Sequence, residues 1–429
     1  MNSLARLESL SIRGMKLGLA AIDALCERLG RPERRVPSVL IGGTNGKGST
    51  AAMIAAIAHA AGIRGGLYTS PHLVDVTERI RVSERDVTRE ELDSALARVF
   101  RAADASPEIP VTYFEAMTAA AFEAFAERAL DLAVLEVGLG GRFDATNVAP
   151  ARLSAVTAIA LDHVEELGPT VAAVAGEKAG IFRRGRPALF GGSHPVARGV
   201  MREAARAIGA AFHDVAAECS VEGANSGLDG MRFSLATPEG EYALSMPLPG
   251  RHQAENAAVA VRVAELLAPE LPRLTREAIG AGLAAVRWPG RLERFSVAGR
   301  DVLLDGCHNP DGAAALARFL EDAGIGSRCR LVFGAMADKD IEGIAEILFP
   351  RVGGVTLVGV ASARAATPEE LVRRVAGARP DARVAGNVGE ALRGLLAAPE
   401  PEPIIVAGSL YLVGEARLLL LAGSLERDG

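Results

Sequence analysis

The sequence predicts an α/β protein with two domains, each built around a mostly parallel sheet. Short apolar runs alternate with helical patterns along most of the 429 residues, and this alternation is typical of parallel strands joined by helices. A chain of this length exceeds what one hydrophobic core usually serves. Because the pattern restarts near Trp288–Arg291, we place a boundary at residue 290 and expect domains of 1–290 and 291–429.

The N-terminal domain is predicted to form its sheet from apolar runs that end in glycine or polar residues. The run "STAAMIAAIAHAAG" follows the first of them, with apolar residues at helical spacing and Gly62 as its expected end. Residues 191–246 are less regular and indicate no clear role in the sheet. Strands are expected over 38–43, 64–70, 130–141 and 153–163, and helices over 49–62 and 112–129.

The C-terminal domain repeats the alternation on a smaller scale. The stretch "DVLLDGCHNPDGAAALARFLEDAG" is typical of a strand, a loop and a helix, and "CRLVFGAMADKD", "GVTLVGVAS", "ARVAG" and "EPIIVAGSLYLVGEA" continue the pattern. We therefore expect a Rossmann-like α/β domain. No second glycine-rich dinucleotide fingerprint is present, so the sequence does not predict NAD binding there.

Composition excludes several classes of function. The net charge of −6 predicts neither a nucleic-acid partner nor an anionic membrane surface. The four cysteines show no C-x-x-C spacing, which disfavours a zinc site or a disulfide framework. The N-terminus lacks the apolar region of a signal peptide, and no run of 18 apolar residues occurs. We expect a cytoplasmic protein without a membrane span.

The stretch "IGGTNGKGST" resembles a phosphate-binding loop but departs from the usual pattern. In G-x-x-x-x-G-K-[ST] the hydroxyl follows the lysine directly, whereas Gly48 stands between Lys47 and Ser49 here. The alternative is a glycine turn with a solvated lysine. Because the stretch lies between a buried strand and a helix, where backbone N–H groups form an anion site, we favour a nucleotide loop with Lys47 on the phosphates and Ser49 or Thr50 facing magnesium.

Acidic and basic residues follow two of the predicted strands. Glu136 ends an apolar run and precedes glycines that allow close backbone approach, so it is a candidate for magnesium beside the loop. Asp162 and His163 end another run, where a metal or phosphate role and a surface role are about equally supported. Glu177 and Lys178, in "GEKAGI", would pass alone as a solvated helical pair.

The second domain has a polar loop directly after its first predicted strand. Asp305 and His308 lie in "LLDGCHNPDG", where ligands usually bind in an open sheet. Asn309 or Asp311 could instead only cap the helix that follows. Spacing alone moderately favours a site role for this loop.

Twelve motifs together resemble the folylpolyglutamate synthase and dihydrofolate synthase family, a branch of the Mur-type ATP-dependent amide ligases. They occur in order along nearly the whole chain, and the ordered set is far more specific than any single motif. In this family the loop carries glycine after the lysine, which accounts for the departure above. The motifs are "GGTNGKGST", "LYTSPHL", "ERIRV", "TYFEAMTAAAF", "LEVGLGGRFDATN", "ALDHVEELGPT", "GEKAGIF", "LPGRHQAENAAVA", "WPGRLE", "LDGCHNPDG", "GAMADKD" and "GSLYLVG".

The resemblance implies that ATP phosphorylates a carboxylate and that the amino group of L-glutamate then attacks the acyl phosphate. Metals and cations must neutralise the anionic groups that meet in this reaction. By likeness to the family, Ser70 and Glu136 bind one Mg²⁺, and Glu136 and His163 bind a second. Lys178 matches a lysine that is carbamylated in the family, which would supply another oxygen ligand. Lys47 and the loop amides would hold the γ-phosphate.

The resemblance also assigns nucleotide-binding positions in both domains. Asn256, Arg291 and Asp305 match ATP-contacting residues of the family, and His308 is expected near the transferred phosphate. Lys47, Lys178 and His308 are the predicted catalytic residues. The ATP loop itself comprises Thr44, Asn45, Gly46, Lys47, Gly48 and Ser49.

Two further segments match the part of the family that holds the dihydropteroate. Glu115 suits the paired N–H donors of a pterin, but it could equally be an ordinary acid in the first turn of a helix. The implied partners are dihydropteroate, reduced folates, L-glutamate and ATP, with a monomer expected. The predicted substrate residues are Thr112, Tyr113, Phe114, Glu115, Phe143, Asp144 and Ala145.

The alternatives differ in how far they depart from this chemistry. The nearest is a folylpolyglutamate synthase without the dihydropteroate reaction; the Tyr-Phe-Glu segment favours both activities. A ligase of cell-wall precursors fits "TSPHL" and "DGCHNP" less well. A P-loop NTPase switch is disfavoured because no N-K-x-D motif accompanies the loop, and an inactive binding module because the metal and phosphate positions are intact.

Overall fold

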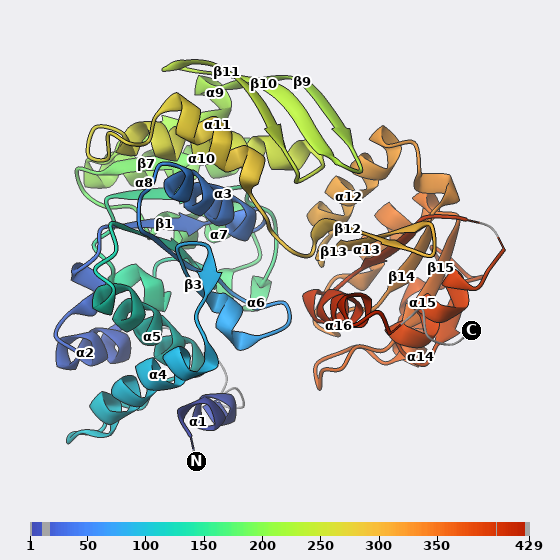
Figure 1. The fold of residues 1–429 in the computed structure, drawn as a ribbon, viewed down its shortest axis with the longest axis horizontal. Coiled ribbons are helices and arrows are strands. Elements are labelled where there is room, and N and C mark those ends of the chain that lie inside the picture. Colours follow the sequence, from blue (N-terminus) through green and yellow to red (C-terminus); the bar gives the residue numbers. More distant parts are fainter. Residues whose placement is uncertain (1, 11–17, 400, 425–429) are drawn as a thin grey trace. The chain divides into compact units, whose positions relative to one another are not determined.

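The protein, represented by a computed structural model, forms two compact units; residues 2–10, 18–399 and 401–424 are described (Figure 1). The change of unit at Val286 lies close to the boundary predicted at residue 290, which itself stays a prediction. The sequence did not indicate that two short upstream segments join the second unit. The first unit comprises Met1–Glu222, Ser234–Leu244 and Glu255–Val286, and the second comprises Gly223–Phe233, Ser245–Ala254 and Arg287–Gly429.

The first unit contains an eight-stranded sheet with the order β4-β3-β2-β5-β1-β6-β7-β8. Strands β2, β5, β1, β6, β7 and β8 run parallel, and the hairpin of β3 and β4 is antiparallel. The predicted parallel sheet is therefore confirmed. The strands are β1 (Ser38–Gly42), β2 (Gly65–Tyr68), β3 (Ile80–Val82), β4 (Arg85–Asp86), β5 (Leu132–Glu136), β6 (Leu153–Val156), β7 (Pro187–Phe190) and β8 (Ala211–Asp214).

Two predicted strands were too long. The run over 130–141 forms a strand only as far as Glu136. The apolar run over 153–163 suggested a strand that ends at His163, but β6 ends at Val156. Beyond it the chain turns to the loop that follows β1: Thr44 N donates to Ala158 O (2.7 Å), and the Thr44 hydroxyl donates to Ala160 O (3.0 Å). These contacts replace a strand pairing, so His163 is not at the end of a strand.

Helix α3 (Lys47–Ala60) is apolar on every face because it is covered on every face. All residues from Ser49 to Ala58 are buried, and α11 (Arg276–Ala285) packs against it. Close packing is possible because Gly282 has no side chain: a Cβ there would lie 2.4 Å from Ile57 Cα. Gly62, with φ of +68°, follows the C-terminal cap as predicted.

The remaining helices of the first unit flank the sheet or connect its strands. Residues 191–246, which the sequence left undefined, contain α8, the edge strand β8, α9 and a three-stranded sheet of β9, β10 and β11. The helices are α1 (Ser3–Leu10), α2 (Ala20–Arg28), η2 (Pro32–Arg34), η3 (Val76–Arg79), α4 (Arg89–Asp104), α5 (Tyr113–Glu127), η4 (Ala145–Val148), α6 (Val164–Leu167), α7 (Val171–Ala179), α8 (Pro195–Ile208), α9 (Val215–Glu218) and α10 (Arg251–Leu267).

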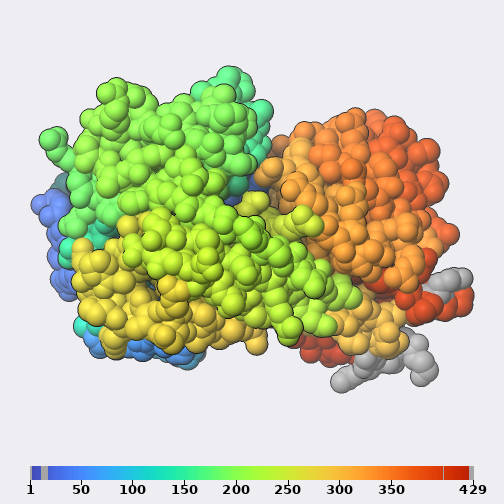
Figure 2. Space-filling model, turned by 90° about the horizontal axis from the view of Figure 1, so that it is seen from above, coloured from blue at the N-terminus to red at the C-terminus, as the bar shows by residue number. Residues whose placement is uncertain are grey.

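The three-stranded sheet has one buried and one exposed face. Residues alternate between buried and exposed along β10 (Gly230–Thr237) and β11 (Gly240–Met246), as expected for a sheet packed on one side only. Strand β9 (Ser220–Gly227) is largely exposed, and atoms of this part of the chain, yellow-green in Figure 2, lie on the viewed surface.

The second unit is built on a six-stranded sheet with the order β12-β13-β17-β14-β15-β16. Only β12 and β13 pair antiparallel; the other pairs are parallel, which confirms the predicted α/β class. The strands are β12 (Arg291–Val297), β13 (Arg300–Asp305), β14 (Arg330–Phe333), β15 (Gly354–Val358), β16 (Arg383–Ala385) and β17 (Ile404–Ala407). The helices are α12 (Pro310–Asp322), η5 (Gly326–Arg328), α13 (Ile341–Leu348), η6 (Phe349–Arg351), α14 (Pro368–Val375), α15 (Val388–Leu396) and α16 (Leu410–Leu421).

Within the described residues, no helix has both the length and the apolar character needed to span a bilayer.

The packing of α3 on α11 generates a stability prediction. Gly282→Ala should destabilise the protein by about 1–3 kcal/mol, because its Cβ meets the backbone of Ile57 rather than a movable side chain. Gly280→Ala on the same helix has nothing within 4 Å of its Cβ, and helix propensity should make it stabilising by up to about 1 kcal/mol. The midpoint of urea unfolding measures both, and equal midpoints would contradict this packing.

Candidate active site

The phosphate loop passes between Thr157 and Asn256, and two of its glycines leave no space for a side chain. Gly43 and Gly46 have φ values of +139° and +88°. A Cβ on Gly43 would lie 1.9 Å from Thr157 Oγ1, and one on Gly46 would lie 2.2 Å from Asn256 Oδ1. The structure therefore brings Asn256, predicted to contact ATP, directly against the loop.

Lys47 is the first residue of α3, at the positive end of the helix dipole. Its Nζ donates to Thr44 O over 3.0 Å, so the side chain folds back over the loop. Ser49 and Thr50 are buried in the first turn, and Thr50 N donates to Gly46 O. This strand-loop-helix unit has the local geometry of an anion site.

Lys178 reaches the same loop from α7. The side chain is buried, and its Nζ donates to Gly43 O over 2.8 Å. Burial in the first place, and then the positive charge of Lys47, lower the pKa of Lys178 to about 7. A substantial fraction of this amine is therefore neutral near neutral pH, which is the form that reacts with electrophiles.

Glu136 and Ser70 meet beside the loop. Glu136 ends β5 and pairs with Ile41 of β1, the strand that leads into the loop. Its buried Oε2 accepts a hydrogen bond from Ser70 N over 3.0 Å. Mg²⁺ is usually held by one or two carboxylates together with phosphates and waters, so Glu136 beside a phosphate loop fits a divalent metal, with the Ser70 hydroxyl as a further oxygen donor.

The described residues do not form a metal site from the usual ionisable ligands alone. Among the described ranges, no three His, Cys, Asp or Glu side chains gather in a metal-binding arrangement. His163 has a left-handed backbone (φ +51°) and precedes α6, with its ring 3.9 Å from both Asp162 and Glu166. The second metal and its ligands stay a prediction.

The two predicted substrate segments lie next to each other across Gly138. A Cβ on Gly138 would be 2.6 Å from Phe114 Cζ and 3.3 Å from Asp144 Oδ2. Phe143 is 44% exposed. The structure therefore brings Phe114 of one segment and Asp144 of the other together at Gly138, two residues after Glu136.

Both acidic side chains of these segments already organise their own backbone. Glu115 Oε2 accepts from Thr112 N and Thr112 Oγ1, each over 2.8 Å, in a capping box. Asp144 accepts from Gly138 N, Leu139 N and Thr146. Burial raises the pKa of Asp144 despite these donors. Glu115 lies in the first turn of α5, as the alternative interpretation expected. Its role toward a substrate stays a prediction.

The second unit brings Arg291, Asp305 and His308 together. Arg291 and Asp305 pair across β12 and β13, and Asp305 accepts from Leu292 N and Cys307 N. His308 Nδ1 donates to Gly306 O over 2.9 Å, which puts the proton on that nitrogen. The loop follows the second strand of the unit, β13, rather than the first as expected.

Asn309 caps α12 by accepting from Gly312 N. Asn309 therefore has the helix-capping role that the sequence left open as an alternative to a site role.

Arg183 is a residue that the sequence did not single out. It donates to Asn147 O and Oδ1 (both 2.7 Å), to Ala149 O (3.0 Å) and to Ile181 O (2.9 Å). Asn147 Nδ2 in turn donates to Gly180 O over 3.2 Å. These contacts, called the Arg183 clamp below, join the segment that follows the Phe143–Ala145 loop to the turn that follows Lys178.

Glu78 is a second such residue, within the motif "ERIRV". Its carboxylate accepts from Leu73 N (2.7 Å), Val74 N (3.2 Å) and Asp75 N (3.1 Å). The loop after Ser70 is therefore closed on itself by one side chain. Asp75 and Glu78 have the spacing of a capping box, which is a readable signal for the start of η3 but not for the bonds to Leu73 and Val74.

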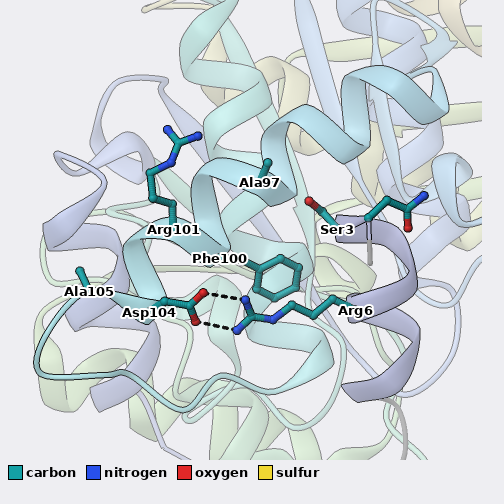
Figure 3. Close-up of a pocket in the computed structure, with 8 residues that line it drawn as sticks. Ser3, Arg6, Ala97, Phe100, Arg101, Asp104 and Ala105 are labelled. Atoms are coloured by element: carbon teal, nitrogen blue, oxygen red, sulfur yellow. Dashed lines mark hydrogen bonds and ion pairs between the residues drawn. The ribbon is translucent and has the colours of Figure 1, made fainter.

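A hollow with a volume of 510 Å³ lies elsewhere, beside α1 and α4. Figure 3 shows Arg6 and Asp104 paired through two hydrogen bonds next to Phe100. None of the predicted site residues lines it, so we do not assign it to the reaction.

Two Mur ligase families match the chain. The Mur ligase middle domain matches residues 41–264, and the Mur ligase glutamate ligase domain matches residues 290–410. The folylpolyglutamate synthase of Lacticaseibacillus casei is 36% identical over 94% of both chains. The dihydrofolate synthase/folylpolyglutamate synthase of Bacillus subtilis is 37% identical over 78% of this chain and 79% of its own.

Solved structures agree over nearly the whole length. Mycobacterium tuberculosis folylpolyglutamate synthase, complexed with ADP and AMPPCP, has a TM-score of 0.90 at 34% identity and covers 97% of this chain and 98% of its own. Escherichia coli FolC, in complex with DHPP and ADP, has a TM-score of 0.88 at 30% identity and covers 99% of both chains. A bifunctional synthase with Mn, AMPPNP and L-glutamate bound has a TM-score of 0.86 at 31% identity and covers 98% of both chains. The chain therefore belongs to the Mur ligase superfamily, in the branch of the dihydrofolate synthase/folylpolyglutamate synthases, and is an ATP-dependent ligase.

Proposed function

We propose that this enzyme adds L-glutamate both to dihydropteroate, giving dihydrofolate, and to the γ-carboxyl group of reduced folates. The observation that carries the proposal is the convergence of Lys47, Lys178 and the Glu136–Ser70 pair on one phosphate loop. A phosphoryl transfer between two anions requires such a concentration of cations and metal-binding oxygens. The proposal describes a monomeric cytoplasmic enzyme.

The reaction has two chemical steps. In the first, an oxygen of the acceptor carboxylate attacks the γ-phosphorus of ATP, the bond to the β-phosphate oxygen breaks, and ADP leaves. In the second, the amino group of glutamate attacks the acyl carbon, inorganic phosphate leaves, and the nitrogen loses a proton. Lys47 and the loop amides would hold the transferred phosphate, with Asn256, Arg291 and Asp305 on the nucleotide and His308 near the phosphate.

The ligase uses a divalent metal, and we propose that two Mg²⁺ ions serve it. When bound, they neutralise phosphate charge and draw the reacting oxygens together. Glu136 and Ser70 would hold one ion; Glu136, His163 and a carbamylated Lys178 would hold the other. Support comes from the buried position of Glu136 and from the lowered pKa of Lys178.

The function is tested by phosphate release from ATP in the presence of magnesium, with dihydropteroate and tetrahydrofolate as separate acceptors. Glutamate-dependent release is expected with both, and release with tetrahydrofolate alone would narrow the activity to polyglutamylation.

The role of Lys47 predicts a loss of activity. Lys47→Ala should reduce both rates at least about 10²-fold, because a cation at the transferred phosphate is lost. His59→Ala, exposed near the other end of α3, is the control. Undiminished activity of Lys47→Ala would remove the loop from the mechanism.

Carbamylation of Lys178 predicts a dependence on CO₂ and pH. Only the neutral amine reacts with CO₂, and with a pKa of about 7 its fraction rises as the pH increases from 6 to 8. Activity in CO₂-depleted buffer should therefore be low and should recover when CO₂ is restored, faster at pH 8 than at pH 6 when the two buffers hold the same concentration of dissolved CO₂. Lys178→Arg should not respond to added CO₂. A native mass lacking one added CO₂ in fully active enzyme would contradict the proposal.

A role of Glu115 at the pterin predicts a selective loss. Glu115→Ala should impair the dihydropteroate reaction more than tetrahydrofolate extension, measured as kcat/KM for each acceptor. The variant also loses a capping box, at a cost of about 1 kcal/mol. Glu91→Ala removes the equivalent capping box of α4 and controls for that loss. Equal impairment of both reactions by Glu115→Ala would exclude the assignment.

A further inference from the structure

Arg79, at the end of η3, is a buried cation that the proposed mechanism does not use. Only 8% of the residue is exposed. Its Nε donates to His72 Nδ1 over 2.9 Å, and its Cζ lies 5.2 Å from the centre of the Tyr113 ring. Within the described ranges no carboxylate lies at ion-pair distance from Arg79. Burying a guanidinium without an anion is costly, so its position calls for an anionic partner.

The position of Arg79 places this charge between two parts of the site. Its backbone oxygen accepts from Thr69 N over 3.0 Å, next to the predicted metal ligand Ser70. Its guanidinium faces Tyr113, the first residue of the predicted substrate helix. The neighbouring Phe114 packs against Tyr68, with ring centres 6.1 Å apart.

The contacts of Arg79 leave the edge of its guanidinium that carries the two Nη groups available for a ligand. One face lies toward the ring of Tyr113, and Nε is used by His72. The two Nη groups form no hydrogen bond to any residue that the structure describes. Two N–H groups on one edge of a planar fork match the two oxygens of a carboxylate.

We propose that Arg79 binds a carboxylate of the acceptor substrate. The proposal rests on the proposed function, in which every acceptor is a carboxylate. Two sources share this chemistry: the reacting carboxylate, present in dihydropteroate and in folates, and the α-carboxylate of the glutamyl group, present in folates alone.

The test measures equilibrium binding of dihydropteroate and of tetrahydrofolate without ATP, by calorimetric titration of the full chain. Arg79→Met should weaken acceptor binding at least tenfold, while the Kd for ATP stays within twofold of wild type. Arg85→Met makes the same change of charge on the exposed β3–β4 hairpin and should leave both values unchanged. Weaker binding of both acceptors identifies the reacting carboxylate as the partner, and weaker binding of tetrahydrofolate alone identifies the α-carboxylate.

Unchanged binding of both acceptors to a folded Arg79→Met variant would overturn the proposal. Arg79→Lys covers the case in which the methionine variant does not fold, because it keeps the charge. Raising the salt concentration must then weaken acceptor binding to wild type and to Arg79→Lys, and salt-independent binding to both would also overturn it. Because binding is measured without turnover, a wild type that binds acceptors but forms no amide would refute the proposed function and leave the role of Arg79 standing.

Discussion

The absence of side chains at Gly43 and Gly46 is the constraint on which the nucleotide site depends. The loop passes so close to Thr157 and Asn256 that a single methyl group would collide with either. Positive φ at both glycines turns the backbone so that α3 begins directly at Lys47. The far side of α3 is fixed by the same device, since Gly282 lets another helix backbone approach. Glycines therefore allow close backbone packing at both ends of α3, and this packing fixes the position of Lys47.

The sequence predicted the regular parts of the fold because their patterns are local. Strands β1, β2 and β5 are short apolar runs bounded by glycine or polar residues, and each was located to within a few residues. The run after Leu153 misled because its apolar residues continue past the sheet and pair with the phosphate loop instead. The alternation along β10 was a readable strand signal, but it lay in a region judged irregular as a whole.

The site residues that stand in family motifs could be predicted from the sequence. Residues whose side chains bind backbone groups were harder to predict. Lys47, Glu136 and Lys178 stand in motifs, and the structure brings them together at one loop. Arg183 acts through carbonyl groups, which every residue possesses, so no sequence pattern distinguishes it. Glu78 has the capping-box spacing with Asp75, but that pattern does not show that its carboxylate also closes the loop after Ser70. For Glu115 and Asp144 the motif indicated a substrate role, whereas the structure shows that each also stabilises its own loop.

The Arg183 clamp has a consequence for how this enzyme can diverge. Four hydrogen bonds join Asn147 and Ala149, just after the loop that presents Phe143, to the turn behind Lys178. A displacement of either segment is therefore inherited by the other, since neither can relax without breaking the shared contacts. The segment predicted to hold the acceptor and the lysine predicted to serve the metal are thus linked through one set of hydrogen bonds in this chain. Grafting a foreign acceptor loop would require its partner turn to be transplanted with it.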